Sequence, residues 1–325
     1  MERAGFLSNL WGIVERPAGR VNGTETSKPP LKDKMMLHPF RPFALMLAAL
    51  AALQAPALHA QTQQEMPAMT QKTLALGEKT LAYLQTGAGP AVVIIHGVGG
   101  HKEDWQGVAS ALAATHTVYA IDMLGFGASS KTGDDLSMTV QAAAVKALLE
   151  AEGLTSADIV GNSVGGWVAA TFAATYPDSV THLILIDAAG FKAMFEGTPP
   201  VNFDPNDAAE MQALINITIN SPIAQTPGLA EKALAAYIAS GEKAISATWG
   251  KSLFGSTRLE DLLPKIKAPT LVLWGADDKL FPSVLAGVFA GQISGATSQL
   301  IPNAGHFPQI DAPEATIAAI ATFLK

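Results

Sequence analysis

The chain has 325 residues, with 21 Lys and Arg against 28 Asp and Glu, a net charge of −7. Hydrophobic residues make up 49% and charged residues only 15%, which excludes an intrinsically disordered protein. There is no Cys, which excludes disulfides, thiolate metal sites and a cysteine nucleophile, and the acidic balance argues against a nucleic-acid-binding protein.

An export signal is predicted near the N-terminus. Residues 43–53 (FALMLAALAAL) form an apolar run with Arg41 before it and small residues up to Ala60 behind it, which is the pattern of a signal peptide. The run is shorter than the roughly 20 apolar residues that a membrane span needs. We therefore expect a signal peptide over 35–60 and a periplasmic or secreted protein without a stable membrane span after cleavage. An uncleaved signal that anchors the chain to a membrane is the alternative.

Residues 1–34 fit poorly in front of such a signal, because they mix Gly, Pro and charge without periodicity. We expect translation to start at Met35 or Met36, so that residues 1–34 result from a misplaced start. The alternative is that residues 1–34 are a disordered tail. After residue 60 the chain keeps 14 Lys and Arg against 24 Asp and Glu, and Arg258 is its only arginine.

From residue 71 onward, short apolar runs alternate with Ala-rich helical segments. The runs are 91–95, 117–121, 158–160, 182–186 and 270–274, with a further strand-like stretch at 298–301; the helical segments are 139–152, 164–176, 283–292 and 314–324. Repeated strand–helix alternation predicts a mostly parallel sheet with helices on both faces. The segments 73–76 and 80–84, around Gly77, predict an antiparallel hairpin at the sheet edge.

The alternation stops between residues 190 and 258. This stretch contains helical patches at 208–219 and 229–239, several prolines and no strand–helix alternation. We interpret it as a helical cap, inserted at about 190–258 into one domain that spans 71–325.

The motif with the most specific chemistry is the sequence GNSVG at 161–165, a G-x-S-x-G that joins a buried strand to a helix. In that context the tight turn holds its serine, Ser163, in strained backbone geometry at the carboxyl end of the sheet. Ser163 is therefore the candidate nucleophile. A chance serine in a glycine-rich turn is the alternative.

A serine nucleophile needs a histidine base that a carboxylate orients. His306 follows a strand-like run and precedes the last helix, in a loop that Gly305 frees, and the other histidines have no comparable context. Asp277 and Asp278 directly follow the strand at 270–274, and either one could serve as the acid.

Backbone N–H groups are the usual donors to the oxyanion of acyl transfer. The sequence HGVGG at 96–100 follows a strand and supplies flexible backbone, so the N–H groups of Val98 and Val164 are the expected pair. This segment matches neither a dinucleotide-binding nor a phosphate-binding glycine fingerprint.

Taken together, these pieces resemble the α/β-hydrolase superfamily over about residues 73–325. The matching segments are 96–100 (HGVGG), 122–130 (DMLGFGASS), 161–167 (GNSVGGW), 274–282 (WGADDKLFP) and 303–314 (NAGHFPQIDAPE). The H-G-x-G-x-x-K pattern followed by a Trp, with LIDAAGF at 185–191, resembles the bacterial family V lipases and esterases. This resemblance implies the α/β-hydrolase fold and cleavage of carboxylic esters through an acyl-enzyme. It also favours Asp278 over Asp277 as the acid.

Relatives of that superfamily with other chemistry provide the alternatives. Haloalkane dehalogenases and epoxide hydrolases carry an aspartate where this chain has Ser163. Carbon–carbon bond hydrolases of the meta-cleavage product type share G-N-S-x-G-G but bind their carboxylate substrates with a cap arginine, and Arg258 lies at the end of the cap. Cofactor-free perhydrolases or haloperoxidases use the same triad, and some proteins of this fold are non-enzymatic receptors that often lack a triad member.

Apolar side chains of the cap region are the candidates for an acyl pocket. The chosen set is Trp167, Met194, Phe195, Trp249 and Phe254, and Phe203, Met211, Ile215 and Leu253 belong to the wider group. The alternative for each is simple packing of the cap onto the body. A small-molecule ester is the expected partner, and no metal site or cofactor is expected, because neither HExxH nor an acidic calcium loop occurs.

Overall fold

The computed structural model describes residues 68–133, 135–196 and 199–325. The predicted upstream segment 1–34 and the predicted signal peptide 35–60 lie outside the described residues. Among the described residues, no helix combines the length and the apolar character that a membrane crossing requires.

An eight-stranded sheet forms the centre of the fold, in the order β1-β2-β4-β3-β5-β6-β7-β8. The strands are β1 (Thr70–Leu76), β2 (Lys79–Gly87), β3 (Ala91–Ile95), β4 (Thr117–Ile121), β5 (Ala157–Asn162), β6 (Val180–Ile186), β7 (Thr270–Gly275) and β8 (Thr297–Ile301). Strands β3 to β8 are mutually parallel, and β2 is antiparallel to both of its neighbours. The predicted mostly parallel sheet and its edge hairpin are confirmed, with the hairpin turn at Gly77 in the left-handed region (φ 63°).

The inner strands form because their side chains are apolar on both faces. All five residues of β3 (AVVII) are buried, as are all six of β5. Continuous apolar runs of this kind are typical of parallel strands covered by helices on both sides. The parallel register places the carboxyl ends of β3, β5, β6 and β7 along one edge of the sheet.

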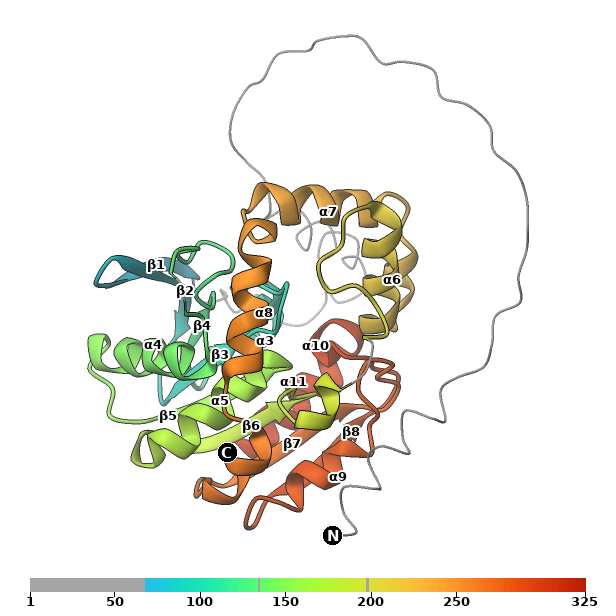
Figure 1. Ribbon diagram of the computed structural model, residues 1–325. Coiled ribbons are helices and arrows are strands. Elements are labelled where there is room, and N and C mark those ends of the chain that lie inside the picture. Colours follow the sequence, from blue (N-terminus) through green and yellow to red (C-terminus); the bar gives the residue numbers. More distant parts are fainter. Residues whose placement is uncertain (1–67, 134, 197–198) are drawn as a thin grey trace, which may run out of the picture. The chain divides into compact units, whose positions relative to one another are not determined.

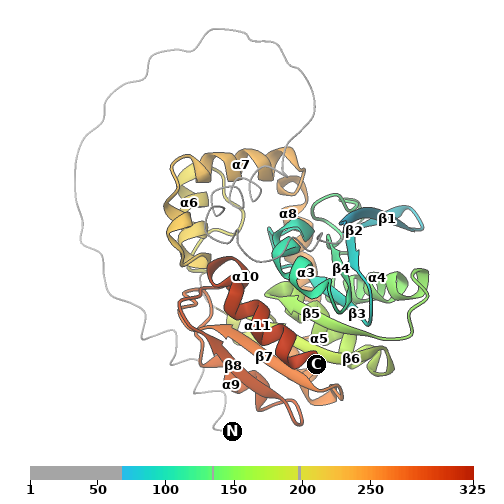
Figure 2. The same cartoon turned by 180° about the vertical axis from the view of Figure 1, so that it is seen from behind.

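Helices cover both faces of this sheet (Figures 1 and 2). They are α3 (Gln106–Leu112), α4 (Met138–Ala151), α5 (Val164–Thr175), α9 (Leu285–Ala290), α10 (Pro308–Asp311) and α11 (Pro313–Phe323). One apolar cluster joins α3 and α11 to the sheet residues that point to their side. Helices α4 and α5 pack against each other, and α5 contacts β5 and β6. This is the α/β-hydrolase architecture that the sequence resemblance implies.

Three of these helices differ from the expectation. Helix α9 begins at Leu285 instead of residue 283, because the Leu285 N–H donates to the Pro282 carbonyl over 3.0 Å and closes a turn there first. Helices α3 and α10 were not predicted. Helix α3 has only seven residues, and Gly107 lowers its helical propensity, whereas α10 has only four residues.

Between β6 and β7 lie residues 190–258, which we call the cap segment. It contains α6 (Ala208–Thr218), α7 (Leu229–Ala239) and α8 (Ser246–Gly255). The α6 N-terminus is capped by Asp207, whose side chain accepts a hydrogen bond from the Glu210 N–H over 2.9 Å. Figures 1 and 2 show these helices at the end of the sheet where the parallel strands finish.

Short 3-10 helices complete the described elements. They are η1 (Lys102–Trp105), η2 (Pro177–Ser179), η3 (Lys192–Phe195), η4 (Pro222–Gln225), η5 (Lys243–Ile245), η6 (Leu259–Asp261) and η7 (Leu263–Lys265).

Close packing of α5 against β3 leads to the first prediction. A Cβ added at Gly165 would overlap the backbone carbonyls of Ile95 and His96. Gly165→Ala should therefore lower the thermal midpoint, because backbone atoms must move to accept the methyl group. Gly107→Ala is the matched control: its Cβ would meet nothing within 4 Å, so helical propensity should stabilise the protein by up to about 1 kcal/mol. Equal effects of the two substitutions in thermal unfolding would contradict this reading.

Candidate active site

Ser163 occupies the junction between β5 and α5, with φ 55° and ψ −121°. A non-glycine residue rarely adopts a positive φ, so its neighbours must hold it there. The Ser163 N–H donates to the Ile186 carbonyl over 2.9 Å, and its own carbonyl accepts from Ala189 N–H over 3.0 Å. Gly161 and Gly165 approach so closely that a Cβ at Gly161 would overlap the Gly165 backbone. The structure thus places Ser163 on the sharp strand-to-helix turn expected from its motif.

His306 and Asp278 form a buried pair beside this turn. The His306 Nδ1 lies 2.9 Å from the Asp278 Oδ2, and both side chains are almost fully buried. The other oxygen of Asp278 accepts the backbone N–H groups of Leu280 and Phe281 over 2.8 and 3.0 Å. An acceptor at Oδ2 places the imidazole proton on Nδ1 and leaves Nε2 as an acceptor. That Nε2 is buried without a hydrogen-bond partner among the described residues, and His306 and Ser163 line one cavity.

The neighbouring aspartate has a different environment. Asp277 is exposed, and its carboxylate accepts a hydrogen bond from the Asn220 amide over 3.5 Å. Of the two candidates, the structure therefore brings Asp278, and not Asp277, to His306.

Sequence reasoning missed the residue that ties the serine turn to the histidine loop. The buried amide of Asn162 donates to the Ile186 carbonyl over 3.2 Å and to the His306 carbonyl over 3.1 Å. Asn162 stands next to Ser163 in the motif, but a motif does not show which distant carbonyls its amide reaches. The position of the His306 backbone is thus fixed relative to that of Ser163.

The turn that contains Val98 packs directly on the serine. A Cβ at Gly97 would come within 2.9 Å of the Ser163 Cβ, and Val98 lines the same cavity as Ser163. Val164 is the first residue of α5, so its N–H has no intrahelical acceptor. Both expected oxyanion donors therefore belong to backbone that borders the serine.

His96 fixes this turn. Its Nε2 accepts the Met123 N–H over 3.0 Å, which leaves Nδ1 to donate to the Gly97 carbonyl at 2.6 Å. Burial lowers the pKa of His96 to about 4, so the ring is neutral and holds one tautomer at physiological pH. The sequence alone suggested only a strand-end turn for this histidine.

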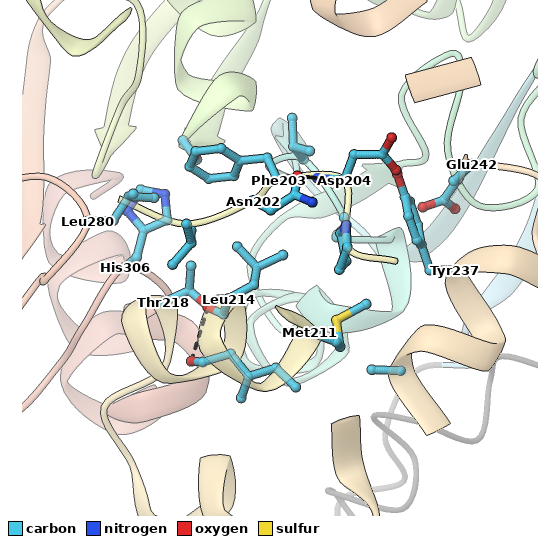
Figure 3. Close-up of a pocket in the computed structure, with 18 of the residues that line it drawn as sticks. Asn202, Phe203, Asp204, Met211, Leu214, Thr218, Tyr237, Glu242, Leu280 and His306 are labelled. Carbon is cyan, nitrogen blue, oxygen red and sulfur yellow. Dashed lines mark hydrogen bonds between the residues drawn. The ribbon is translucent and has the colours of Figure 1, made fainter. Parts of the chain in front are cut away.

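A cavity of about 760 Å³ opens over Ser163 and His306 and extends under the cap segment. Most of its walls are apolar. In Figure 3, His306 and Leu280 lie at one end of the view and Tyr237 and Glu242 at the other, with Met211 and Leu214 between them. A cavity of this size and lining suits an apolar small molecule.

Four of the five residues chosen for the acyl pocket do not line this cavity. Trp249 does line it, as do Phe203, Met211, Ile215 and Leu253 from the wider group; Trp167, Met194, Phe195 and Phe254 do not. Trp167 is fully buried and donates its indole N–H to the Thr257 carbonyl over 2.8 Å.

The excluded aromatic residues instead surround Arg258. Its guanidinium lies 5.3 Å from the Trp167 ring and 4.8 Å from the Phe195 ring, in cation–π contact with both. Phe254 packs on Phe195 and is 65% exposed. Arg258 does not line the cavity.

The cavity wall also contains a buried ion pair between the body and the cap segment. His101 Nε2 lies 2.9 Å from the Glu242 Oε1, and both side chains are almost fully buried. Burial alone would lower the pKa of His101, but the hydrogen bond and the charge of Glu242 outweigh it and raise that pKa to about 9. Nearby, burial raises the pKa of the Asp104 carboxyl to about 6. Among the described lining residues, the positively charged group is therefore His101, which Glu242 neutralises.

One group of side chains has the composition of a metal site. Asp187, Asp278 and His306 each place one potential ligand atom within 4.8 Å of the others. The His306 Nδ1 and both oxygens of Asp278 are engaged in the hydrogen bonds described above, so the group is organised as a hydrogen-bonded network.

Comparisons with known proteins agree with this geometry. A family model described as the alpha/beta hydrolase fold matches residues 90–313, about two thirds of the chain. Lipase 1 of Psychrobacter immobilis is 30% identical over 262 residues, which cover 75% of this chain and 80% of the lipase. A 2-hydroxy-6-oxo-6-(2'-aminophenyl)hexa-2,4-dienoic acid hydrolase of Metapseudomonas resinovorans is 28% identical over 251 residues, 75% of this chain and 87% of that enzyme. The crystal structure of a membrane phospholipase A, described as a bacterial virulence factor, superposes with a TM-score of 0.70 at 27% identity and covers 86% of this chain and 91% of its own.

The buried ion pair predicts how stability depends on pH. The pKa of His101 is about 9 in the folded protein and about 6.5 without its surroundings, so the stabilisation is complete below about pH 6.5 and is lost as the pH rises through 9. Glu242→Gln should therefore lower the thermal midpoint at pH 6, and the difference from wild type should shrink by pH 9.5. Glu150→Gln, which removes an exposed pair with Lys146, is the control and should stay near wild type throughout. A constant difference for Glu242→Gln across this range would count against the pair.

Proposed function

The chain belongs to the alpha/beta hydrolase family, and on that premise we propose that it is a serine hydrolase that cleaves carboxylic esters through an acyl-enzyme. The observation that carries the proposal is the Ser163 turn, whose serine lines the same cavity as His306, and the Nε2 of His306 has no hydrogen-bond partner in the described part of the chain. The lipase of Psychrobacter immobilis among the relatives supports the ester class of substrate.

In the proposed reaction, the Ser163 hydroxyl attacks the ester carbonyl while the His306 Nε2 takes its proton. The Nδ1 proton stays hydrogen-bonded to Asp278, which orients the ring and stabilises the imidazolium. The imidazolium then donates its proton to the departing alcohol, and the acyl group remains on Ser163. Water then attacks the acyl carbonyl while His306 takes its proton, and the imidazolium returns that proton to the Ser163 oxygen as the acid leaves.

The tetrahedral intermediates carry a negative charge on the former carbonyl oxygen. We assign its stabilisation to the backbone N–H groups of Val98 and Val164. The Val164 N–H is free at the α5 N-terminus, where the helix dipole also favours a negative charge. The neutral His96 keeps the Gly97 turn in position for the other donor.

The apolar cavity under the cap segment indicates an apolar acyl or alcohol group in a small-molecule ester. No cofactor takes part in the proposed steps. All the groups named belong to one chain, so the proposed reaction does not depend on the oligomeric state.

Carbon–carbon bond hydrolysis is the second candidate, favoured by the dienoic acid hydrolase among the relatives. A carboxylate substrate needs a cation in the cavity. Arg258 instead contacts Trp167 and Phe195 outside it, and His101 is neutralised by Glu242. The charge distribution therefore supports neutral esters.

We further propose that the enzyme acts in the periplasm or as a secreted protein, on the strength of the signal-like segment 35–60. An uncleaved signal would instead leave it anchored to a membrane. N-terminal sequencing of the exported protein tests this: a mature terminus near Gln61 or Leu58 supports cleavage, and a terminus at Met35 or Met36 supports the anchor.

The nucleophile is tested by Ser163→Ala with a panel of p-nitrophenyl esters from acetate to palmitate. We expect ester hydrolysis to fall by at least about a thousandfold with thermal stability retained, because only oxyanion stabilisation and binding remain. Asp278→Asn should lose on the order of 10⁴ in kcat through misorientation of His306. Asp277→Asn is the matched control and should lose little, because its side chain is exposed. A Ser163→Ala enzyme with a tenth or more of the wild-type rate would rule out the proposed nucleophile.

The charge of the cavity predicts selectivity. Asp104, Asp204 and Glu242 line it, and its positive charge is neutralised, so substrates with a free carboxylate should bind poorly. We expect kcat/KM for p-nitrophenyl butyrate to exceed that for the p-nitrophenyl monoester of succinate by about a hundredfold, roughly 2.7 kcal/mol of transition-state binding. Equal values for the two esters, or turnover of a meta-cleavage product faster than of any ester, would favour the second candidate.

A further inference from the structure

One buried carboxyl beside the proposed triad has no role in the mechanism above. Asp187 directly follows β6, has a φ of 44° and is fully buried. Its Oδ1 accepts the Gly275 N–H over 2.8 Å, whereas its Oδ2 has no hydrogen-bond partner within the described chain. A buried carboxylate oxygen without a donor is costly, so the chemical state of Asp187 needs an explanation.

The neighbours of Asp187 are negative rather than positive. A carboxyl oxygen of Asp187 lies within 4.8 Å of one from Asp278 and of a His306 ring nitrogen, and the charge of Asp311 adds a smaller repulsion. Burial raises the pKa of Asp187 well above its usual range, and the charge of Asp278 adds to this effect. Two carboxyl groups this close cannot both be ionised at low cost, so one of them keeps a proton.

The hydrogen-bond donors around each group decide which one keeps it. Asp278 accepts three N–H groups, from Leu280, Phe281 and His306, and each of these bonds favours its ionised form. From the described part of the chain, Asp187 accepts one N–H group, that of Gly275. A carboxylate offers about four acceptor positions, so Asp278 has one left for an O–H donor.

We propose that Asp187 is a protonated carboxylic acid that donates a hydrogen bond to the Asp278 carboxylate and so positions the acid of the triad. This inference rests on the proposed function. It makes Asp187 a positioning residue: it acts on the substrate only through Asp278 and His306, and its Gly275 contact fixes its own carboxyl between β6 and β7.

Asp187→Asn tests the protonation state, because an amide can still accept from Gly275 and donate to Asp278. If Asp187 is neutral, this substitution leaves the charge beside His306 unchanged. Activity should stay within about threefold of wild type, and the acid limb of the kcat/KM profile should move by less than about 0.3 pH unit. If Asp187 is ionised, the substitution removes a negative charge, and the acid limb moves to lower pH by about one unit. That shift would overturn the proposal.

Infrared difference spectroscopy of the free enzyme gives a readout that does not depend on catalysis. Wild type minus Asp187→Asn at pH 7 should contain the carbonyl stretch of a protonated carboxylic acid. A carboxylate stretch in its place would overturn the proposal even if Ser163 is the nucleophile. Conversely, an active Ser163→Ala enzyme would defeat the proposed function and leave this spectrum unaffected.

The positioning role is tested by Asp187→Ala, which removes the donor. We expect kcat to fall at least tenfold with KM changed less than twofold, because Asp278 loses a partner but the cavity is intact. Wild-type kcat in this variant would overturn the role.

Asp158→Asn is the matched control: Asp158 is buried and pairs with His182 at 2.8 Å, but it lies at the opposite end of β5 from Ser163. It should change neither the acid limb nor the protonated-acid band. If Asp187→Ala does not fold, the Asn variant and the spectrum still decide the proposal.

Discussion

The hydrogen bond between the His306 Nδ1 and the Asp278 Oδ2 is the interaction on which the proposed chemistry depends. It fixes the imidazole tautomer and leaves Nε2 as an acceptor, and His306 lines the same cavity as Ser163. Its strength comes from burial, since both side chains are almost wholly removed from solvent. The same burial makes loss of either partner costly, because a buried polar group left without a hydrogen bond carries its full desolvation penalty.

Keeping this pair in position requires contacts from several parts of the chain. Asn162 joins the serine turn to the His306 carbonyl, and Asp311 accepts N–H groups from Gly305 and from Asn220 at the end of α6. The His306 N–H itself donates to the Thr218 carbonyl of the same helix over 2.9 Å. The cap segment therefore supports the histidine loop and also lines the cavity. Elsewhere in the cap segment, Glu242 connects this segment to the body through its hydrogen bond with His101.

Much of the fold could be predicted because its signals are local. The predicted strands at 91–95 and 117–121 have the same bounds as β3 and β4, because a strand buried on both faces is a continuous apolar segment. The turn of Ser163 could be predicted because G-x-S-x-G encodes both its strain and its close packing. The choice of Asp278 over Asp277 came from family resemblance and not from residue patterns, and it is Asp278 that contacts His306.

What could not be predicted depends on contacts between distant segments. Asp187 reads as the end of a strand, and only the fold brings it beside Asp278, about ninety residues away in sequence. Some of the expected pocket residues lie elsewhere for the same reason: Trp167 and Phe195 are apolar, but their side chains contact Arg258 and do not line the cavity. Apolar character alone does not distinguish a cavity wall from packing.

The central claim, an acyl-enzyme on Ser163, is tested most directly by acid-quenching the enzyme during turnover of a slow ester and mapping peptides by mass spectrometry. The account predicts the acyl mass on the peptide that contains Ser163 and its absence in Ser163→Ala. Steady turnover with an acyl group on another residue, or with none trapped even when deacylation is made rate-limiting, would contradict it.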